Sequence, residues 1–390
     1  MSTLKVDAIR HNSATSDAIT TAADGTCTAK VTSVGGGQLS HRNLVINGDM
    51  KISQRGTSFA DSANGSYTLD RFLIQNSSGT PAFTVTQDSD APHGFNNSLK
   101  VACTTADASP ASGSFSRIRY TIEAQDLQPL AKGTSSAKTS TLSFYVKTNK
   151  TGVYTVFVYD DDNNRMFSAN YTVSDTNWNR YTIIIPADTT GAINDDNGAG
   201  FVIHWGLSLG SNRTSGSLAS NWATYSTANE HVGNVNFADN TSNVWAITGV
   251  QLEVGDTATS FEHRSFTEEL TRCYRYYRRF GANGALPTPG AYNRFSIGYS
   301  PSSTGVRFPF QLDPPMRITP VNSNFSKSGS FAIQPGSIGS YSLTCDDNSC
   351  SPNMMVAIMG NTSVSSGTGS AVSLHANNDT SAYIDISAEL

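Results

Sequence analysis

Residues 244–280, with the sequence VWAITGVQLEVGDTATSFEHRSFTEELTRCYRYYRRF, organise the chain because they close one domain and begin the next. In the first part, apolar residues and Thr248 occupy every second position of Val244–Val254, which is the period of a half-buried β-strand. Gln251 and Glu253 stand at intervening positions and are predicted to lie on the opposite face. The stretch therefore begins with a strand that closes a β-domain.

A turn and a short helix follow this strand. Ser265 stands three residues before Glu268, which is the spacing of a capping box, so its hydroxyl can accept a hydrogen bond from the amide of Glu268. We expect a helix of about two turns that begins at Phe266 and ends near Cys273. The aromatic run after the helix is rich in strand-forming residues and predicts a second strand up to Phe280.

The composition of the whole chain predicts an all-β protein. Its 390 residues exceed one ordinary core and suit two domains with a terminal segment. Charged residues make up 15% and aromatic residues 9%, and Gly, Ser, Thr and Asn separate short runs of Val, Ile, Tyr and Phe. Such a chain has many turns and few stretches for long amphipathic helices.

Charge and hydropathy exclude several classes of function. The net charge of −5 lacks the excess of Lys and Arg that a general nucleic-acid or anionic-membrane binder needs. The chain has neither an apolar run long enough to span a bilayer nor the pattern of a signal peptide. We therefore expect a protein made in a cytoplasm, with no nucleic-acid partner and no membrane insertion.

Four segments follow from the distribution of strand and turn signals. Residues 1–42 are polar, with only short apolar stretches. We expect them to form short strands only by pairing with copies of the chain or with a partner; a mobile tail is the alternative. Residues 43–262 carry short strands separated by turns, which predicts a two-sheet sandwich, a jelly roll. Residues 263–280 hold the short helix and a connecting strand. Residues 281–390 predict a small β-domain.

The expected strands fall into two sets. In the sandwich they are Asp70–Gln75, Ala82–Gln87, Leu99–Cys103, Ser114–Ile122, Leu142–Lys147, Val153–Tyr159, Tyr181–Ile185, Phe201–Leu209 and Val244–Val254. In the last segment, prolines are expected to break the first half into short pieces. There, residues 353–359 and 382–387 are predicted as a core strand and an edge strand.

The sequence carries no motif of a known catalytic constellation. No GxSxG elbow, HExxH helix, P-loop or CxxC pair occurs, and the histidines are scattered. Asp160, Asp161 and Asp162 offer oxygen ligands for calcium or carboxylates for glycoside hydrolysis, but a solvated hairpin turn is the simpler interpretation. Cys345 and Cys350 lack the second Cys/His pair of a zinc site. We expect no enzyme activity, no metal and no cofactor.

One loop has the chemistry of a glycan site. Sugars present apolar faces that stack on aromatic rings, and their hydroxyls bond to amides and charged groups. Residues 220–226 and their neighbours supply both kinds of group, and the predicted glycan-binding residues are Trp222, Tyr225, Asn212, Arg213 and Asn221. The alternative is that Trp222 covers the core of the sandwich.

A cluster of arginine and tyrosine follows the predicted helix. Arg is favoured for buried ion pairs and stacks flat on aromatic rings, so the cluster predicts contacts between subunits at a threefold interface. The predicted interface residues are Arg272, Arg275, Tyr276, Arg278 and Arg279. A binding site for an acidic glycan or phosphate is the alternative for the same cluster.

Several of these segments together resemble tail-fibre and related virion proteins of bacteriophages, especially marine and cyanobacterial ones. The matching segments are AsnLeuValIleAsnGlyAsp at 43–49, TyrThrLeuAspArgPhe at 67–72, residues 248–256 and residues 259–277. The opening MetSerThrLeuLysValAspAlaIle also resembles the start of such fibres, where that region attaches the protein to the virion.

The resemblance implies a homotrimeric virion appendage, on the phage tail or capsid and assembled in the host cytoplasm. Its implied partners are other virion proteins, through residues 1–42, and host cell-surface polysaccharide. A purely structural fibre or adaptor without a receptor is one alternative, and a polysaccharide depolymerase is another. Depolymerases of this kind resemble repetitive β-solenoids, and this chain has no repeat of fixed period.

The central segment is also similar to jelly-roll carbohydrate-binding modules. In many of those modules, an acidic residue near the first strand and an Asp in the last strand hold a structural calcium ion. Asp49 matches the first position, whereas Thr248-Gly249 stands where the second Asp is expected. This departure argues against a calcium site.

Overall fold

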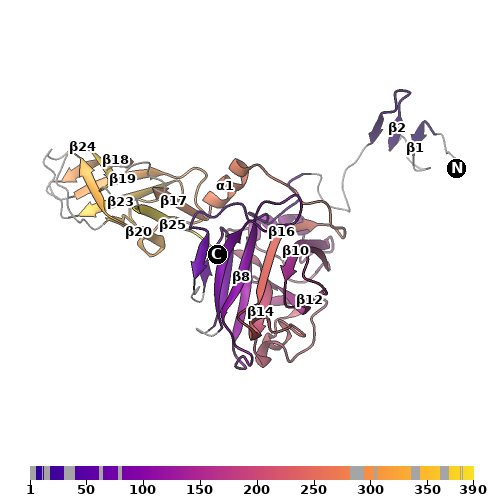
Figure 1. Ribbon diagram of the computed structural model, residues 1–390. Coiled ribbons are helices and arrows are strands. Elements are labelled where there is room, and N and C mark those ends of the chain that lie inside the picture. Colours follow the sequence, from indigo (N-terminus) through magenta and orange to yellow (C-terminus); the bar gives the residue numbers. More distant parts are fainter. Residues whose placement is uncertain are drawn as a thin grey trace.

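The structure is a computed structural model that describes residues 6–10, 12, 18–29, 40–60, 65–77, 81–281, 294–302, 305–334, 343–360, 369–377, 379 and 381–390. Its main body is an all-β jelly-roll sandwich of two antiparallel sheets (Figure 1). Sheet I has the strand order β13 (Asn179–Ile185), β10 (Ser140–Thr148), β16 (Val244–Val254), β8 (Ser98–Thr105), β7 (Ala82–Asp88) and β4 (Ser58–Ala60). Sheet II has the order β15 (Ala223–Thr224), β12 (Arg165–Val173), β11 (Gly152–Asp160), β14 (Ala199–Leu209), β9 (Phe115–Glu123), β6 (Phe72–Asn76) and β5 (Ser66–Tyr67).

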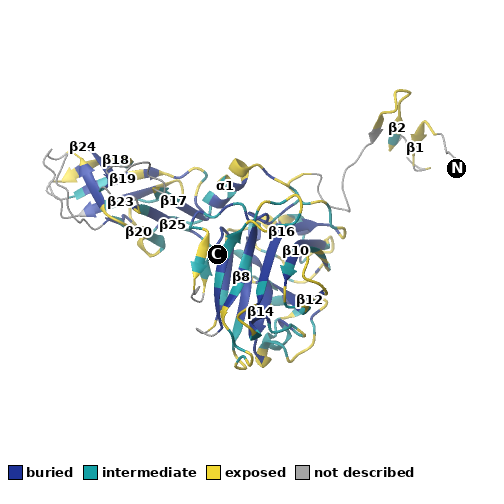
Figure 2. Cartoon of the chain, viewed as in Figure 1, coloured by how far each residue is buried: buried dark blue, intermediate teal, exposed yellow. Residues whose placement is uncertain are grey.

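All nine strands that the sequence predicts for the sandwich are present, with small shifts at their ends. Strand β12 and the short strands β4, β5 and β15 were not predicted. In β12 the alternation of Phe167, Ala169, Tyr171 and Val173 with Ser168, Asn170 and Thr172 was a usable strand signal. The inward faces of the two sheets form one core, in which Phe144 packs edge-on against Trp205 at 5.9 Å between ring centroids. Figure 2 shows buried residues concentrated along these strands.

The side chains of β16 that point into the core are not those that the sequence predicts. Trp245 and Ile247 point into the core, as do Val250, Leu252 and Val254, so the inward set shifts by one residue part-way along the strand. The shift falls at Gly249, which has φ +62°, and two residues of β16 oppose one of β10 there. This is a β-bulge with glycine in the left-handed region, and it breaks the regular alternation that the sequence suggests.

The predicted helix is confirmed as α1 (Phe266–Tyr274). The Ser265 hydroxyl accepts a hydrogen bond from the amide of Glu268 at 3.2 Å, as the capping-box spacing requires. The strand after it is confirmed as β17 (Tyr277–Gly281). Short 3-10 helices occur at η1 (Ala124–Leu130), η2 (Ser211–Arg213), η3 (Thr227–Asn229), η4 (Phe237–Asp239) and η5 (Asn322–Asn324).

The C-terminal segment forms a second hydrophobic core between two further sheets. One sheet has the order β17, β25 (Tyr383–Ser387) and β20 (Phe325–Ser328). The other has the order β21 (Phe331–Gln334), β24 (Ala371–Ala376), β18 (Arg294–Ser302), β19 (Gly305–Gln311), β23 (Met354–Gly360) and β22 (Leu343–Cys345). The core strand predicted at 353–359 is confirmed as β23.

Two expectations for this segment are wrong. Strand β25 is central, since it pairs with β17 on one side and β20 on the other, so the prediction of an edge strand fails. Pro301 and Pro309 lie inside β18 and β19 rather than between strands. The described β18–β19 ladder runs only from Tyr299/Arg307 to Ser302/Gly305, so the missing N–H of Pro309 falls beyond the end of that ladder.

The N-terminal segment pairs differently from the expectation. Strands β1 (Ala8–Ile9), β2 (Ile19–Thr21) and β3 (Cys27–Ala29) form a small antiparallel sheet within one chain. No second copy is needed for this pairing, which corrects the prediction. The side chains of Val6 and Ile9 are 42% and 55% exposed, so this small sheet has little core of its own.

Candidate functional site

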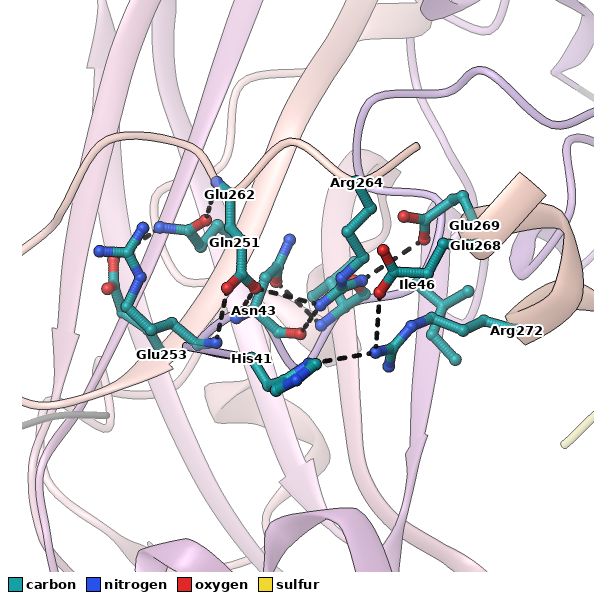
Figure 3. Close-up of polar contacts among 12 residues, drawn as sticks. His41, Asn43, Ile46, Gln251, Glu253, Glu262, Arg264, Glu268, Glu269 and Arg272 are labelled. Carbon is teal, nitrogen blue, oxygen red and sulfur yellow. Dashed lines mark hydrogen bonds and ion pairs between the residues drawn. The ribbon is translucent and has the colours of Figure 1, made fainter. Parts of the chain in front are cut away.

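Residues 41–46, 251–253 and 262–272 meet at the joint between the sandwich and α1 (Figure 3). The Glu262 carboxylate accepts the backbone amides of Arg42 and Asn43 at 3.1 and 2.9 Å. The Arg264 guanidinium donates to the carbonyl oxygens of Asn43 and Val45. Residues about 220 apart in the sequence are therefore held together by buried polar groups.

A second layer of the joint is built on Asn47 and Asp70. Asn47 has φ +60° and its side-chain amide donates to the carbonyl oxygens of Ile52 and Asp70, each at 2.9 Å. The Asp70 carboxylate accepts the amide of Gln54 at 2.9 Å, and the Gln54 side chain reaches the carbonyl of Tyr277 at 3.0 Å. The AsnGlyAsp and AspArgPhe segments therefore fix where β17 leaves the sandwich.

The last residues of the chain return to the same joint. The buried Arg71 guanidinium pairs with Glu389 and stacks on the ring of Tyr276, with 3.4 Å between its central carbon and the ring centroid. Arg55 pairs with Glu389 from the other side at 3.2 Å. The joint thus links both hydrophobic cores through paired charges.

The predicted interface residues make contacts within the chain. Arg275 forms two hydrogen bonds with Glu123 at 2.7 and 2.8 Å, and Arg279 does the same with Asp385 at 2.8 and 2.7 Å. Arg278 donates to the Pro314 carbonyl at 2.8 Å. Tyr276 is buried, and Arg272 pairs at 3.2 Å with Glu268 on the helix surface. Contacts between subunits through these residues stay a prediction.

The predicted glycan residues do not form one cluster. The Trp222 indole donates to the Pro186 carbonyl at 2.8 Å, and its ring packs against Phe201 at 5.3 Å on the side of the sandwich core. This is the core-covering role that the sequence left as an alternative. Asn212 and Asn221 are exposed.

Tyr225 and Arg213 lie instead on the outer face of sheet II, where the buried carboxylate of Glu230 joins them. The Tyr225 hydroxyl donates to Glu230 at 2.6 Å, and Arg213 and Arg117 donate to its other oxygen at 2.5 and 3.1 Å. Burial, followed by the hydrogen bond to Glu230, raises the pKa of the Tyr225 phenol. The Glu230 carboxylate therefore holds the loop of η2 and η3 on the sheet. Its single negative charge neutralises only one of the two positive charges of Arg117 and Arg213.

Three residues that the prediction omitted complete this face. The Tyr159 ring meets the Tyr225 ring at 5.2 Å and 66°, and both side chains are partly exposed. Arg119, two residues from Arg117 on β9, has no hydrogen bond or ion pair among the described residues, and its Nε is buried. Asp161 stands at the end of β11, where burial raises its pKa and the charge of Arg119 opposes this rise.

The sequence contained a usable signal for part of this face. In β9, Arg117 and Arg119 alternate with the core residues Ile118 and Tyr120, which indicates that the arginines face outward. In β11, Phe157 and Tyr159 alternate with apolar Val156 and Val158, so both faces look apolar and the sequence alone does not identify the outer one.

Two buried histidines lie beneath the loop. His204 pairs with Arg119 across the β9–β14 ladder and stacks on Phe157 at 5.2 Å and 11°, and His231 meets Phe157 edge-on at 5.9 Å. Burial, and next the charge of Arg117, hold the pKa of both imidazoles well below its usual range. Burial and repulsion from Arg213 also lower the pKa of Arg117, to about 10.

These histidines predict acid sensitivity. The unfolded chain binds protons at His below pH about 6.5, whereas the folded chain keeps both rings neutral, so stability is complete above that pH and is lost as the pH falls. Each proton that the unfolded state binds in excess steepens this loss by up to about 1.4 kcal/mol per pH unit. Urea unfolding of the wild type from pH 7.5 to 5.5 should therefore show falling stability.

A double variant separates the contribution of the histidines to the pH dependence of stability from that of the carboxyl groups. Burial raises the pKa of Asp70, Asp126 and Glu269, which changes stability with pH in the opposite sense. The double variant His204→Gln, His231→Gln keeps these carboxyls, so its pH slope should be shallower than that of the wild type. An unchanged slope would contradict the prediction.

The three consecutive aspartates point in different directions. Asp160 is buried and pairs with Lys132 at 2.6 Å, Asp161 borders the outer face, and Asp162 accepts hydrogen bonds from Asn194. The hairpin between β11 and β12 at this point confirms the turn. Together they offer neither a carboxylate pair nor a shared ligand set.

The two positions that correspond to calcium ligands in the similar modules are bonded to other groups of this protein. Asp49 pairs with the Lys51 ammonium at 2.6 Å, and the Thr248 hydroxyl donates to the Asn97 carbonyl at 2.8 Å. Across the described ranges, no group of three or more His, Cys, Asp and Glu side chains is arranged to hold a metal ion. No helix in the same ranges is long and apolar enough to cross a membrane.

Comparison with known proteins finds only distant structural likeness. No protein-family model matches the chain, and no curated protein is detectably similar in sequence. Tailspike protein 4 of bacteriophage CBA120, its enzymatically active domain, aligns at TM-score 0.29 and 15% identity over 54% of this chain and 21% of its own.

Two bacterial proteins align over their whole length. A putative sugar-binding protein from Bacteroides thetaiotaomicron aligns at TM-score 0.31 and 13% identity, over 55% of this chain and 100% of its own. A family 11 carbohydrate-binding module from Clostridium thermocellum, in complex with a mixed-linked tetrasaccharide, aligns at TM-score 0.27 and 10% identity, over 53% and 99%. Ligand and activity do not transfer at such similarity.

Proposed function

We propose that the sandwich binds a glycan on the outer face of sheet II. The observation that supports this most directly is the partly exposed ring pair of Tyr159 and Tyr225 beside the guanidinium of Arg119, which has no ion-pair partner among the described residues. The rings offer apolar surfaces for the CH face of a sugar, and Arg119 and Asp161 offer a donor and an acceptor for its hydroxyls. The fixed loop beneath Tyr225 keeps its ring in place before the ligand arrives.

The wider proposal is a virion fibre or spike subunit that attaches to host-surface polysaccharide. It is supported by the resemblance of residues 1–9, 43–49, 67–72 and 248–277 to phage appendage proteins. Three copies, fixed to other virion proteins by residues 1–42, would turn weak sugar contacts into firm attachment, because linked sites raise avidity by about 10² to 10⁴. Light scattering that gives a monomer mass for the full chain would contradict the trimer.

Two rival functions predict different results. A structural fibre or adaptor would bind virions but no host glycan. A depolymerase would release reducing ends from host polysaccharide, and the divergent directions of Asp160, Asp161 and Asp162 argue against that chemistry. Glycan binding without reducing-end release supports the attachment function.

The variant Tyr159→Ala tests the glycan face. We expect it to weaken binding roughly tenfold, about 1.4 kcal/mol, because it removes one of the two stacking rings. The measurement is binding to a glycan array, followed by titration of the best ligand. Tyr299→Ala is the matched control, since Tyr299 is 48% exposed in the C-terminal segment and should not affect binding. Equal affinity of both variants and the wild type would remove the assignment to sheet II.

A further inference from the structure

A pocket lies at the joint, away from the outer face of sheet II. It has a volume of about 300 Å³ and is bounded by residues 49–51, by the loop between β7 and β8, and by the start of α1. This volume is at the lower end of the range for small-molecule sites. The walls come from three separate segments. Lys51 donates to the Arg264 carbonyl at the joint, and the Thr248 hydroxyl of β16 donates to the Asn97 carbonyl in the loop.

One wall of the pocket is aromatic. Phe95 packs against His263 at 5.2 Å, Phe261 at 5.0 Å and Tyr145 at 5.4 Å, and Tyr145 belongs to β10 in sheet I. Phe266, the first residue of α1, also lines the pocket and is 59% exposed. An exposed aromatic side chain at a helix start adds nothing to either core, so its ring is available for stacking.

The other wall carries polar groups with open hydrogen-bonding capacity. Asp49 is only 7% exposed; its Oδ2 pairs with Lys51 at 2.6 Å, whereas its Oδ1 is buried without a partner. A buried acceptor without a partner is costly, which makes a donor on a ligand favourable there. The side-chain amides of Asn96 and Asn97 also line the pocket and have no hydrogen-bond partner in the described part of the chain.

The charges of the pocket favour a neutral ligand. The Lys51 ammonium lies against Asp49 and also donates to the Arg264 carbonyl at 2.8 Å, so a cation would meet an ammonium already in place. An anion would meet the Asp49 carboxylate. A neutral molecule with several hydroxyls and one apolar face satisfies the groups that remain, since hydroxyls both donate to Asp49 and bond to the amides.

We propose that this pocket binds one neutral sugar unit, with its apolar face on Phe266 and a hydroxyl donating to Asp49. The site is independent of the glycan face on sheet II, because no residue of the one lines the other. The protein then has two glycan contacts per chain, one on the outer face of sheet II and one beside the start of α1.

Saturation-transfer NMR with the full chain tests the pocket. The ligands are glucose, galactose, mannose and N-acetylglucosamine, each added alone at about 50 mM, well above a millimolar Kd. We expect at least one to bind, and Phe266→Ala to weaken it roughly tenfold. Ile297→Ala, which removes an apolar side chain that is 67% exposed elsewhere, should leave this binding unchanged. Tyr159→Ala measures how much of the signal comes from the outer face of sheet II.

Each other outcome overturns the proposal. Absence of binding by all four sugars, or binding that Phe266→Ala does not change, removes the pocket as a sugar site. Loss of binding in Tyr159→Ala alone assigns the sugar to the outer face of sheet II, which upholds the proposed function and rejects the second site. Calcium chloride that shifts the amide signals of Asn96 and Asn97 without sugar identifies a cation site instead.

Discussion

Replacement of Arg71 by alanine should lower the free energy of unfolding by about 3–5 kcal/mol. Arg71 is 2% exposed, pairs with Glu389 and donates to the Thr121 carbonyl at 2.5 Å. Its removal leaves the buried Glu389 carboxylate with one remaining partner, Arg55. The ring of Tyr276 also loses the guanidinium that stacks on it. Urea unfolding at neutral pH measures the change.

Two further variants sharpen this prediction. Arg272→Ala removes an arginine that pairs on the helix surface with Glu268, four residues away, and should cost at most about 0.5 kcal/mol. Arg71→Lys keeps the charge but loses the planar stack on Tyr276, so its cost should fall between the two. Similar losses for Arg71→Ala and Arg272→Ala would show that the joint contributes little to stability.

The joint gives the segments 43–49, 67–72 and 259–277 a physical role. Asn43, Asn47 and Arg71 each bond to residues beyond position 260. Asp70 binds Gln54, whose side chain reaches the Tyr277 carbonyl. These contacts determine where α1 and β17 leave the sandwich. A sequence pattern spread over residues 43–277 is therefore what a fixed connection between two β-units requires, whatever ligand the sandwich binds.

The local features of the fold were predictable from the sequence. Alternation located the nine strands of the sandwich, and the spacing of Ser265 and Glu268 located α1, because both depend on residues close in the chain. The facing of β16 was not predictable, since the bulge at Gly249 depends on pairing with β10. Ion-pair partners were equally hidden, because Arg71 and Glu389 are 318 residues apart.

The residues of the candidate site also divide into those that the sequence predicts and those that only the structure shows. Tyr225 and Arg213 were found because loops rich in aromatic and polar residues are recognisable in sequence. Tyr159 and Arg119 come from the middle of strands, and only the structure shows that they meet the loop on one face. Trp222 and Tyr225 are three residues apart, yet the short strand β15 between them places their rings on opposite sides of sheet II.

Replacement of Glu230 by alanine should have the second large effect, a loss of about 3–5 kcal/mol of stability together with weaker glycan binding. Glu230 is 1% exposed and is the only described ion-pair partner of Arg117 and of Arg213. Without it, two guanidinium groups repel each other beside Arg119, which has no ion-pair partner in the described ranges, and Tyr225 loses its acceptor. The loop that carries Tyr225 should detach from the sheet, and the ring pair with Tyr159 should open.

The isosteric variant Glu230→Gln separates charge from packing. It keeps the volume of the side chain and an acceptor for Tyr225, so a loss close to that of Glu230→Ala would show that the negative charge between the arginines is what holds the loop. Glu268→Ala, with a side chain 42% exposed, is the matched control and should cost at most about 0.5 kcal/mol. Urea unfolding and titration with the array-selected glycan measure both effects. If Glu230→Ala loses stability but binds the glycan normally, then the ligand does not depend on the position of Tyr225, and Tyr159 and Arg119 alone carry the face.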